Sequence, residues 1–370
     1  RFFWKLQSND RDASQSAYRI LVASTPEVLR RDEGELWDSG EVASDRTAHV
    51  AYEGKPLQSE GKYYWKVRSW DREGIASDWS EIYYWTMGLL SREEWKGAWI
   101  GRKAEPNVEL QPSPYVRREF RVEGDIRRAT VYATALGLYE LRVNGRTIGD
   151  KFAPGFTDYD KRVQTQTYDV TPWLTEGDNA IGAVLGDGWY SGTVGFLGNH
   201  VYGERPFFLL QLNIEYADGR RESVATDGSW RTAKGPIVYS DMIKGETYDA
   251  RLELTGWDRP GYDDSGWERP DVRAGYNGLL TATIEPPIRV TQTLKPLSVR
   301  KTEQGTYIYD MGQNMVGWTE LKVRGARGTK VTISHAEMLN PDGSLYLDNL
   351  RVAVQQEHYI LKGEGEERYE

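Results

Sequence analysis

Two pairs of carboxylates lie close together in this sequence, Asp158 with Asp160 and Asp263 with Asp264. Two carboxyl groups can serve as the general acid and the general base in the hydrolysis of a glycosidic bond. Asp263 and Asp264 are followed by Ser265 and Gly266, however, and such a string is typical of a turn. The chain has 56 acidic residues, so neighbouring carboxylates need no catalytic explanation. We therefore interpret both pairs as turn and surface residues and name no catalytic residue.

Aromatic residues with glycine-rich neighbours are the second group of candidates. The chain has 14 Trp and 23 Tyr, and we expect most of them in cores, because both residue types are good strand formers. Trp189 and Tyr190 follow Gly188, and Tyr159 follows a Pro-Gly-Phe-Thr-Asp string. Glycine-rich neighbours indicate loops, where binding residues concentrate and where a ring can stack on a sugar. Packing beneath the loop is an equally good interpretation of these three residues.

Other familiar reaction centres are missing from the sequence. Its four histidines show no i, i+3 or i+4 spacing, and it has no cysteine, so we expect no zinc site. Its glycine-rich strings lack the lysine of a phosphate-binding loop, and no Gly-x-Ser-x-Gly string occurs.

Composition narrows the range of partners. The 370 residues carry a formal net charge of −9, which disfavours nucleic acid and anionic membrane surfaces. No apolar run approaches the ~20 residues that span a bilayer, so we expect no membrane insertion. No signal peptide opens the sequence, but Arg1 is not a natural start, and a leader could have been removed. The localisation stays open between the cytoplasm and the periplasm or exterior.

The pattern of apolar residues predicts an all-β chain of tandem antiparallel β-sandwiches. Alternation such as Tyr63, Trp65 and Val67 is typical of half-buried strands, and no segment keeps a helical period. Asn144-Gly145 suits a two-residue hairpin turn, because both positions can take positive φ. We divide the chain into three units, residues 1–94, 95–285 and 286–370.

The short apolar string Ala98-Trp-Ile100 is separated from the rest of the second unit by a polar, proline-bearing link. We predict that residues 95–100 pack with the third unit. Residues 115–285 would then be an insertion.

Several strings carry a family resemblance. Leu138-Tyr-Glu-Leu-Arg-Val-Asn-Gly145 and Leu185-Gly-Asp-Gly-Trp-Tyr190 resemble the N-terminal accessory region of bacterial α-L-rhamnosidases. The string that begins Gly256-Trp-Asp-Arg-Pro also resembles that region. Tyr309-Asp-Met-Gly-Gln-Asn-Met-Val-Gly-Trp318 resembles the β-sandwich that follows it in the same enzymes. Earlier in the chain, the Tyr-x-Trp-x-Val strand followed by Trp-Ser resembles fibronectin type III domains.

The resemblance implies a domain order and an activity. It implies a fibronectin-III-like domain, then a jelly-roll-like, carbohydrate-binding-module-like domain, then a truncated β-sandwich that precedes the catalytic (α/α)6 barrel. That barrel lies outside these residues, so this non-catalytic part would be inactive alone. The full-length enzyme would release terminal α-L-rhamnose from glycans or glycosides, with inversion. A related arabinosidase or galactosidase, and a stand-alone carbohydrate-binding or adhesion protein, remain as alternatives.

The resemblance also implies a sugar and calcium site. Some accessory domains of this type bind L-rhamnose through a calcium ion that loop oxygens hold. The matching loops offer Asp150, Asn199 and the carbonyl of Pro206, and such oxygens are calcium ligands. Lys151, beside Asp150, departs from this pattern. We expect Trp189, Tyr190, Tyr159, Asp150 and Asn199 to bind carbohydrate, with rhamnose-containing glycans or glycosides and the C-terminal catalytic domain as partners.

Overall fold

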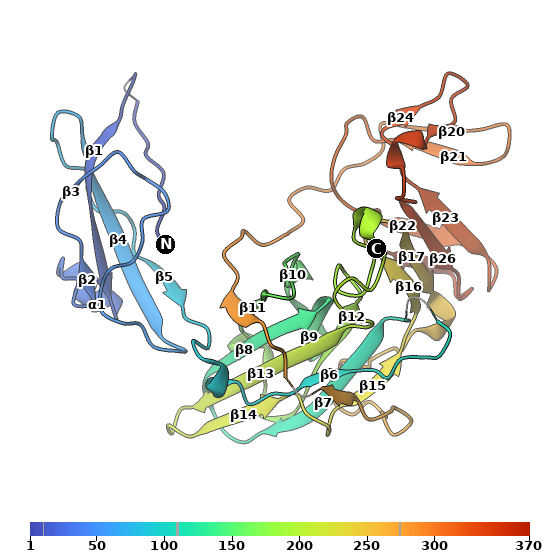
Figure 1. Cartoon of the computed structure of the whole chain (residues 1–370), viewed down its shortest axis with the longest axis horizontal. Helices are drawn as coiled ribbons and strands as arrows, with labels where there is room; N and C mark the ends of the chain where they lie inside the picture. Colours follow the sequence, from blue (N-terminus) through green and yellow to red (C-terminus); the bar gives the residue numbers. More distant parts are fainter. Residues whose placement is uncertain (10, 109–110, 274) are drawn as a thin grey trace. The chain divides into compact units, whose positions relative to one another are not determined.

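The computed structural model describes residues 1–9, 11–108, 111–273 and 275–370, which form two compact units, Arg1–Trp95 and Lys96–Glu370 (Figure 1). Strands dominate both units, and the one α-helix among the described residues, α1 (Pro26–Arg30), has five residues. This confirms the predicted all-β class. Within the same residues, no helix combines the length and the apolar character that crossing a membrane requires.

The first unit is built on one antiparallel sheet with the order β2-β1-β4-β5, in which β3 also pairs with β1. Its strands are β1 (Gln15–Ala23), β2 (Trp37–Asp38), β3 (Val42–Ala43), β4 (Lys62–Asp71) and β5 (Tyr83–Thr86). The alternation predicted around Trp65 lies in β4. Phe2 forms a bridge with Val50 and covers one face of the sheet, where its ring lies 4.8 Å from that of Trp65. The unit ends at a short 3-10 turn, η1 (Arg92–Glu94).

The second unit begins with a two-layer sandwich. One sheet has the order β10-β9-β12-β7-β15, and the other has the order β18-β6-β13-β8-β11-β19 with β14 beside β13. The first sheet consists of β7 (Pro114–Val122), β9 (Leu138–Val143), β10 (Arg146–Ala153), β12 (Gly177–Gly186) and β15 (Arg231–Lys234). The second consists of β6 (Trp99–Gly101), β8 (Ile126–Leu136), β11 (Arg162–Asp169), β13 (Phe207–Tyr216), β14 (Arg221–Ala225), β18 (Asp271–Arg273) and β19 (Leu279–Ala282).

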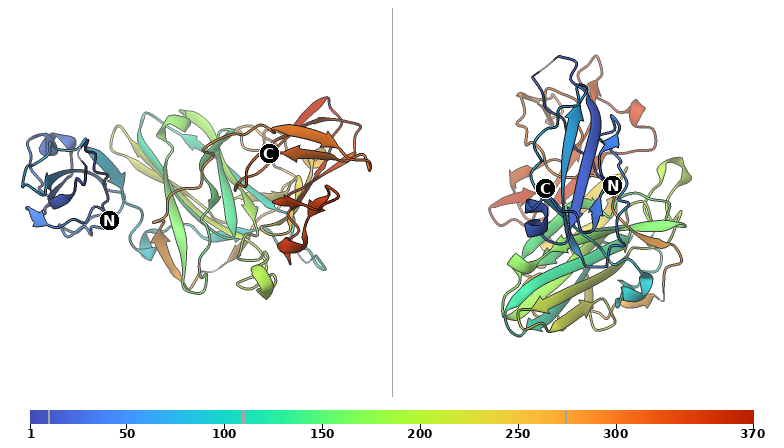
Figure 2. Two further views of the ribbon diagram at one scale, coloured as in Figure 1. Left: turned by 90° about the horizontal axis from the view of Figure 1, so that it is seen from above. Right: turned by 90° about the vertical axis from the view of Figure 1, so that its left-hand side faces the viewer.

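Alternating residues of both sheets form the core of this sandwich, seen from two further sides in Figure 2. Leu141 and Ile181 of the first sheet and Val131 and Leu212 of the second are fully buried in one cluster. Between β9 and β10, Asn144 and Gly145 have φ of 49° and 81°, so the predicted hairpin turn is confirmed. Short 3-10 turns, η2 (Thr171–Trp173) and η3 (Gly195–Leu197), lie in the loops on either side of β12.

Arg117 of β7 fastens the segment after residue 250 to the sandwich. Its side chain is 1% exposed, and its Nε donates to the Trp257 carbonyl at 2.7 Å. Its Nη2 donates to the Arg259 carbonyl at 3.1 Å, and its guanidinium also pairs with Glu119 and Asp264. The buried Arg117 side chain therefore contacts this irregular segment at Trp257, Arg259 and Asp264. The segment includes a 3-10 turn, η4 (Ala250–Leu252).

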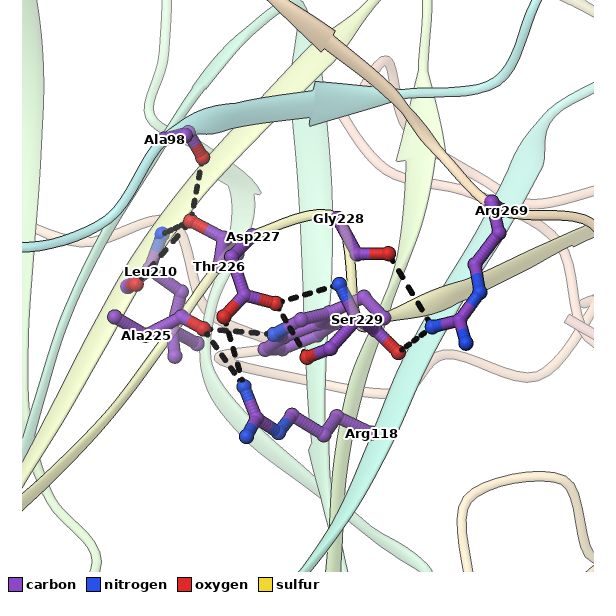
Figure 3. Close-up of polar contacts among 10 residues, drawn as sticks. Ala98, Arg118, Leu210, Ala225, Thr226, Asp227, Gly228, Ser229 and Arg269 are labelled. Carbon is purple, nitrogen blue, oxygen red and sulfur yellow. Dashed lines mark hydrogen bonds and ion pairs between the residues drawn. The ribbon is translucent and has the colours of Figure 1, made fainter.

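The strand at Trp99 belongs to this sandwich, so the predicted packing of residues 95–100 with the third unit is wrong. Trp99 pairs with Arg273 in β18, and its ring lies 5.7 Å from that of Tyr276. Thr226, which is fully buried, donates from Oγ1 to the Ala98 carbonyl at 2.7 Å (Figure 3). These contacts come from residues far along the chain, which the local sequence pattern does not reveal.

The loop that carries Thr226 is itself held from two sides. Asp227 Oδ1 accepts from the Ser229 backbone nitrogen at 2.7 Å, while Arg118 lies 3.3 Å from the other carboxylate oxygen (Figure 3). Arg269 donates to the Ser229 carbonyl at 2.8 Å. These hydrogen bonds hold the loop between β14 and β15 in place, and Thr226 in turn binds the Ala98 carbonyl beside β6.

The remaining strands form small sheets. One sheet has the order β16-β17-β26-β23, and β20–β21, β22–β27 and β24–β25 are two-stranded ribbons. The strands are β16 (Ile237–Asp241), β17 (Gly245–Asp249), β20 (Ser298–Lys301), β21 (Tyr307–Asp310), β22 (Leu321–Arg324), β23 (Lys330–Ser334), β24 (Met338–Leu339), β25 (Leu345–Tyr346), β26 (Gln356–Ile360) and β27 (Glu366–Tyr369), with a 3-10 turn, η5 (Asp348–Leu350), before β26. Because β17 pairs in parallel with β26, this sheet takes strands from both sides of the boundary expected at residue 285.

Candidate carbohydrate-facing loops

Two buried carboxylates position the loop between β12 and β13, which carries most of the candidate residues. Asp187 is 2% exposed and accepts a hydrogen bond from the Ser191 hydroxyl. Asp241, at the end of β16, accepts from the Thr193 backbone nitrogen at 2.8 Å. Burial raises the pKa of Asp187 to about 6, against the opposing effect of the Ser191 hydrogen bond. The two carboxylates hold the inner side of the loop through these hydrogen bonds. The outer residues of the loop can therefore face solvent.

Tyr159 and Tyr190 lie under the loop and do not present a ring to solvent. Their side chains are 2% and 4% exposed, and their rings meet edge to face at 5.2 Å. The Tyr190 hydroxyl accepts from Arg273 at 2.8 Å, and the Tyr276 hydroxyl donates to the Tyr159 carbonyl at 2.5 Å. The expectation that these two rings stack on a sugar is therefore corrected, because stacking needs an open face. Packing beneath the loop is the interpretation that the burial supports.

Trp189 is one of the partly exposed aromatics of the loop, and it has a neighbour that the sequence analysis did not single out. The ring of Phe156, which is 52% exposed, lies 5.5 Å from that of Trp189 at an interplanar angle of 69°. Phe156 follows Gly155, so the glycine criterion that selected Trp189 would have found it. The two rings form an edge-to-face pair at the surface, here called the aromatic pair.

The three expected calcium ligands lie in different surroundings. Asp150 of β10 has its carboxylate 3.5 Å from the Arg289 guanidinium. Asn199 lies in the loop after η3 and is partly buried. The Pro206 carbonyl faces β6, where a Cβ built on Gly101 would lie 2.7 Å from that oxygen.

The calcium site stays a prediction. The Arg289 guanidinium, 3.5 Å from the Asp150 carboxylate, would compete with a bound cation, and calcium needs six to eight oxygens at about 2.3–2.6 Å. Residues 1–9, 11–108, 111–273 and 275–370 contain no group of three or more His, Asp or Glu side chains that could hold a metal.

The two carboxylate pairs occupy turns and ion pairs. Asp158 accepts from the Asp160 backbone nitrogen at 3.2 Å and pairs with Lys161 at 2.9 Å. Asp263 accepts from the Ser265 backbone nitrogen at 3.0 Å, and Asp264 is the partner of Arg117. The turn interpretation of the sequence is confirmed for both pairs.

Three family models match the chain in succession. The model described as the Rha78A-like, N-terminal immunoglobulin domain matches residues 1–91, where the sequence predicted a fibronectin-III-like domain. The model of the α-L-rhamnosidase N-terminal domain matches residues 124–292, and that of the bacterial α-L-rhamnosidase concanavalin-like domain matches residues 300–370. Fibronectin type III domains share the sandwich architecture of immunoglobulin domains.

Characterised relatives match over the whole chain. An α-L-rhamnosidase of Alteromonas sp. (strain LOR) is 40% identical, and the alignment covers 100% of this chain and 41% of that protein. The structure of the Streptomyces avermitilis α-L-rhamnosidase complexed with L-rhamnose is 32% identical, with a TM-score of 0.88, and the match covers 100% of this chain and 52% of that one. The α-L-rhamnosidase of Dictyoglumus thermophilum is 38% identical, with a TM-score of 0.86, at 100% and 42% coverage.

The chain spans about half the length of these relatives or less. Fold, domain order and sequence agree along its full length. The chain therefore belongs to the α-L-rhamnosidase family and corresponds to the N-terminal domains of these enzymes.

Proposed function

We propose that this chain is the non-catalytic N-terminal part of a glycoside hydrolase that releases terminal α-L-rhamnose from glycans or glycosides. The observation that carries the proposal is the match of the whole chain to about half or less of the length of α-L-rhamnosidases. The carboxylate pairs add support, because ion pairs and turns already occupy them. The reaction then belongs to the remainder of the enzyme, and we propose that it proceeds with inversion.

The activity is tested on the full-length protein with p-nitrophenyl α-L-rhamnoside. Matched arabinoside and galactoside substrates separate the proposed activity from those of related glycosidases. Proton NMR of the first sugar released distinguishes inversion from retention. Preference for the arabinoside or the galactoside would contradict the proposed substrate class, and a retained anomer would contradict inversion alone.

A second role is proposed for the aromatic pair. Trp189 and Phe156 offer partly exposed rings on loops that a rigid sandwich holds, which suits weak stacking on a sugar. A stacked ring and a few hydrogen bonds would give a dissociation constant on the order of 0.1–1 mM, or about 4–5 kcal/mol. Stacking needs no metal, so calcium is not part of this proposal.

Titration calorimetry of the chain with L-rhamnose tests this role. We expect Trp189→Ala and Phe156→Ala to weaken binding while the melting temperature stays close to that of the unaltered chain. Trp173→Ala is the control, since Trp173 is 36% exposed in η2 of the same sandwich. Absence of binding heat in the unaltered chain would leave the loops with a structural role alone.

A further inference from the structure

A surface pocket of about 490 Å³ lies where the link after β6 passes the segment before β18. Its lining consists of residues 102–106, Glu268 and Arg269. Its volume falls within the range of roughly 300–1,000 Å³ that is usual for ligand pockets, but its lining is charged, whereas theirs is mostly apolar. A charged lining indicates a charged occupant. We call this feature the arginine pocket.

Arg102 is the buried charge of the arginine pocket. It is 9% exposed, and its Nη1 donates to the Glu105 carboxylate at 2.8 Å. Among the described residues its Nε has no hydrogen-bond acceptor, because the Glu268 carboxylate lies 3.6 Å away. A buried donor without an acceptor costs stability, so such a group in a native fold calls for an explanation. An arginine can bind the two oxygens of a carboxylate or a similar anion through two parallel hydrogen bonds, and the Nε edge of Arg102 is open to such a ligand.

The walls of the arginine pocket are held in place by hydrogen bonds. The buried Gln111 side chain accepts from the Glu105 backbone nitrogen at 2.6 Å and donates to the Glu105 carbonyl at 3.2 Å. On the opposite wall, the backbone of Glu268 pairs with β15. Arg269 donates through its Nη1 to the Ser229 carbonyl at 2.8 Å, as Figure 3 shows. Walls that are already fixed lose little conformational freedom when a ligand binds.

The charges of the lining favour an anion as the occupant. The arginine pocket has three cationic and two acidic side chains. One of the acids, Glu105, is already paired, with Arg102 at 2.8 Å and with Lys234 at 2.9 Å. The other acid, Glu268, has a side chain that is 58% exposed, so it can turn into water while an arriving anion takes the position opposite Nε.

We propose that the arginine pocket binds the carboxylate or the sulfate ester of an acidic saccharide on the Nε edge of Arg102. The inference deepens the proposed function and rests on it, because it takes glycans as the ligands that the enzyme meets. The glycan then carries an anionic group besides its rhamnose. Binding in the pocket holds an acidic glycan on the accessory part, and it involves neither the aromatic pair nor a metal.

Titration calorimetry of the 370-residue chain with D-glucuronate and with glucose 6-sulfate tests the inference. D-Glucose is the neutral comparison, and inorganic sulfate separates the sulfate ester from the free ion. We expect the preferred anionic sugar to bind about tenfold or more tightly than glucose, because hydrogen bonds to a charged group are the stronger kind. The preference should shrink as the salt concentration rises, since salt screens exposed charges.

Glu268→Gln is the sharpest variant, because it removes the carboxylate that competes for Arg102. We expect it to tighten anion binding by about two- to fivefold, which is the effect of one exposed charge pair. Lys103→Met should weaken binding by a similar factor. Arg102→Lys keeps the charge but loses the paired donors, so it should weaken binding by about tenfold or more. Arg127→Met is the control, because Arg127 is 69% exposed on β8 of the same sandwich, and it should change nothing. Melting temperatures check that each variant is folded.

Weaker binding in Glu268→Gln would overturn the inference, because this carboxylate would then recognise sugar hydroxyls and would not compete with an anion. Equal affinity for glucose and both anionic sugars, or no binding heat with any of them, would overturn it as well. Inorganic sulfate bound as tightly as glucose 6-sulfate, without binding of glucuronate, would contradict the assignment to a saccharide.

Rhamnoside hydrolysis by the unaltered full-length protein is measured separately. Binding of an anionic sugar without hydrolysis would support the arginine pocket and contradict the proposed function. Hydrolysis without such binding would do the reverse.

Discussion

Arg117 should be worth far more to stability than a surface arginine on the same strand. Its Nε and Nη2 hydrogen bonds to the Trp257 and Arg259 carbonyls have a charged donor, and each such bond contributes about 1.5–3 kcal/mol. Its ion pairs reach Glu119 and Asp264, whose side chains are 35% and 25% exposed. Solvent weakens such pairs, so we assign them about 0–1 kcal/mol each.

The Arg117→Met variant should therefore lose about 3–5 kcal/mol, which is also the usual cost of breaking a buried ion pair. For a unit of this size, 1 kcal/mol lowers the melting temperature by roughly 2–4 °C, so we expect a fall of about 6–20 °C. Scanning calorimetry should place this fall in the transition of residues 96–370 and leave that of residues 1–95 unchanged.

Arg121→Met is the control for this measurement. Arg121 lies four residues further along β7, is 63% exposed, and pairs at 3.0 Å with Asp178, which is 65% exposed. We expect its loss to cost less than about 1 kcal/mol. Equal effects of the two substitutions would refute the reasoning, because burial would then have no influence on the strength of the arginine contacts.

Four further predictions address the loops and the strand β6. The raised pKa of Asp187 means that the folded state holds the proton more tightly, so this residue should contribute a fall in stability of about 3 kcal/mol as pH rises from about 4 to above 6. Burial also raises the pKa of Glu246 to about 7, so melting curves of Asp187→Asn should keep the contribution of Glu246 and lose that of Asp187; an undiminished fall in the variant would contradict the assignment. Thr226→Val should lower the free energy of unfolding by about 1–3 kcal/mol and speed hydrogen exchange in β6, because the Ala98 carbonyl loses its hydrogen-bond donor. The control Thr147→Val, at an exposed position of β10, should do neither. Tyr276→Phe should lower the melting temperature more than Tyr159→Phe. The first substitution removes a hydrogen bond of 2.5 Å to the Tyr159 carbonyl, and the second removes longer contacts of 3.4 and 3.5 Å. The reverse order would be evidence against the packing described under the loop. Millimolar calcium, or a chelator, should leave the melting temperature unchanged, and stabilisation by calcium would show that Asp150 and Asn199 rearrange to bind it.

Local signals in the sequence were sufficient for the fold class and for individual turns. Period-two alternation depends on the pleat of a single strand, so it located β4 without knowledge of its partners. The Asn144-Gly145 turn is likewise a local property, because positive φ is set by the two residues themselves. The turn role of Asp263 follows from its own neighbours in the same way.

Features that depend on distant residues could not be predicted. Tyr159 is covered by Tyr276 and Tyr190, and Trp99 is paired by Arg273, so neither burial is visible in the neighbouring sequence. The pairing of β17 with β26 joins segments more than a hundred residues apart, across what looks like a linker. Glycine-rich neighbours correctly indicated loops, but a loop residue can lie on either the outer or the inner side of its loop.

The most direct test of the account is the release of p-nitrophenol from p-nitrophenyl α-L-rhamnoside by the full-length protein and by this 370-residue chain. The account predicts release by the full-length protein and no release by the chain above a heat-inactivated control. Hydrolysis by the chain alone would contradict the claim that these domains are the non-catalytic part of an α-L-rhamnosidase.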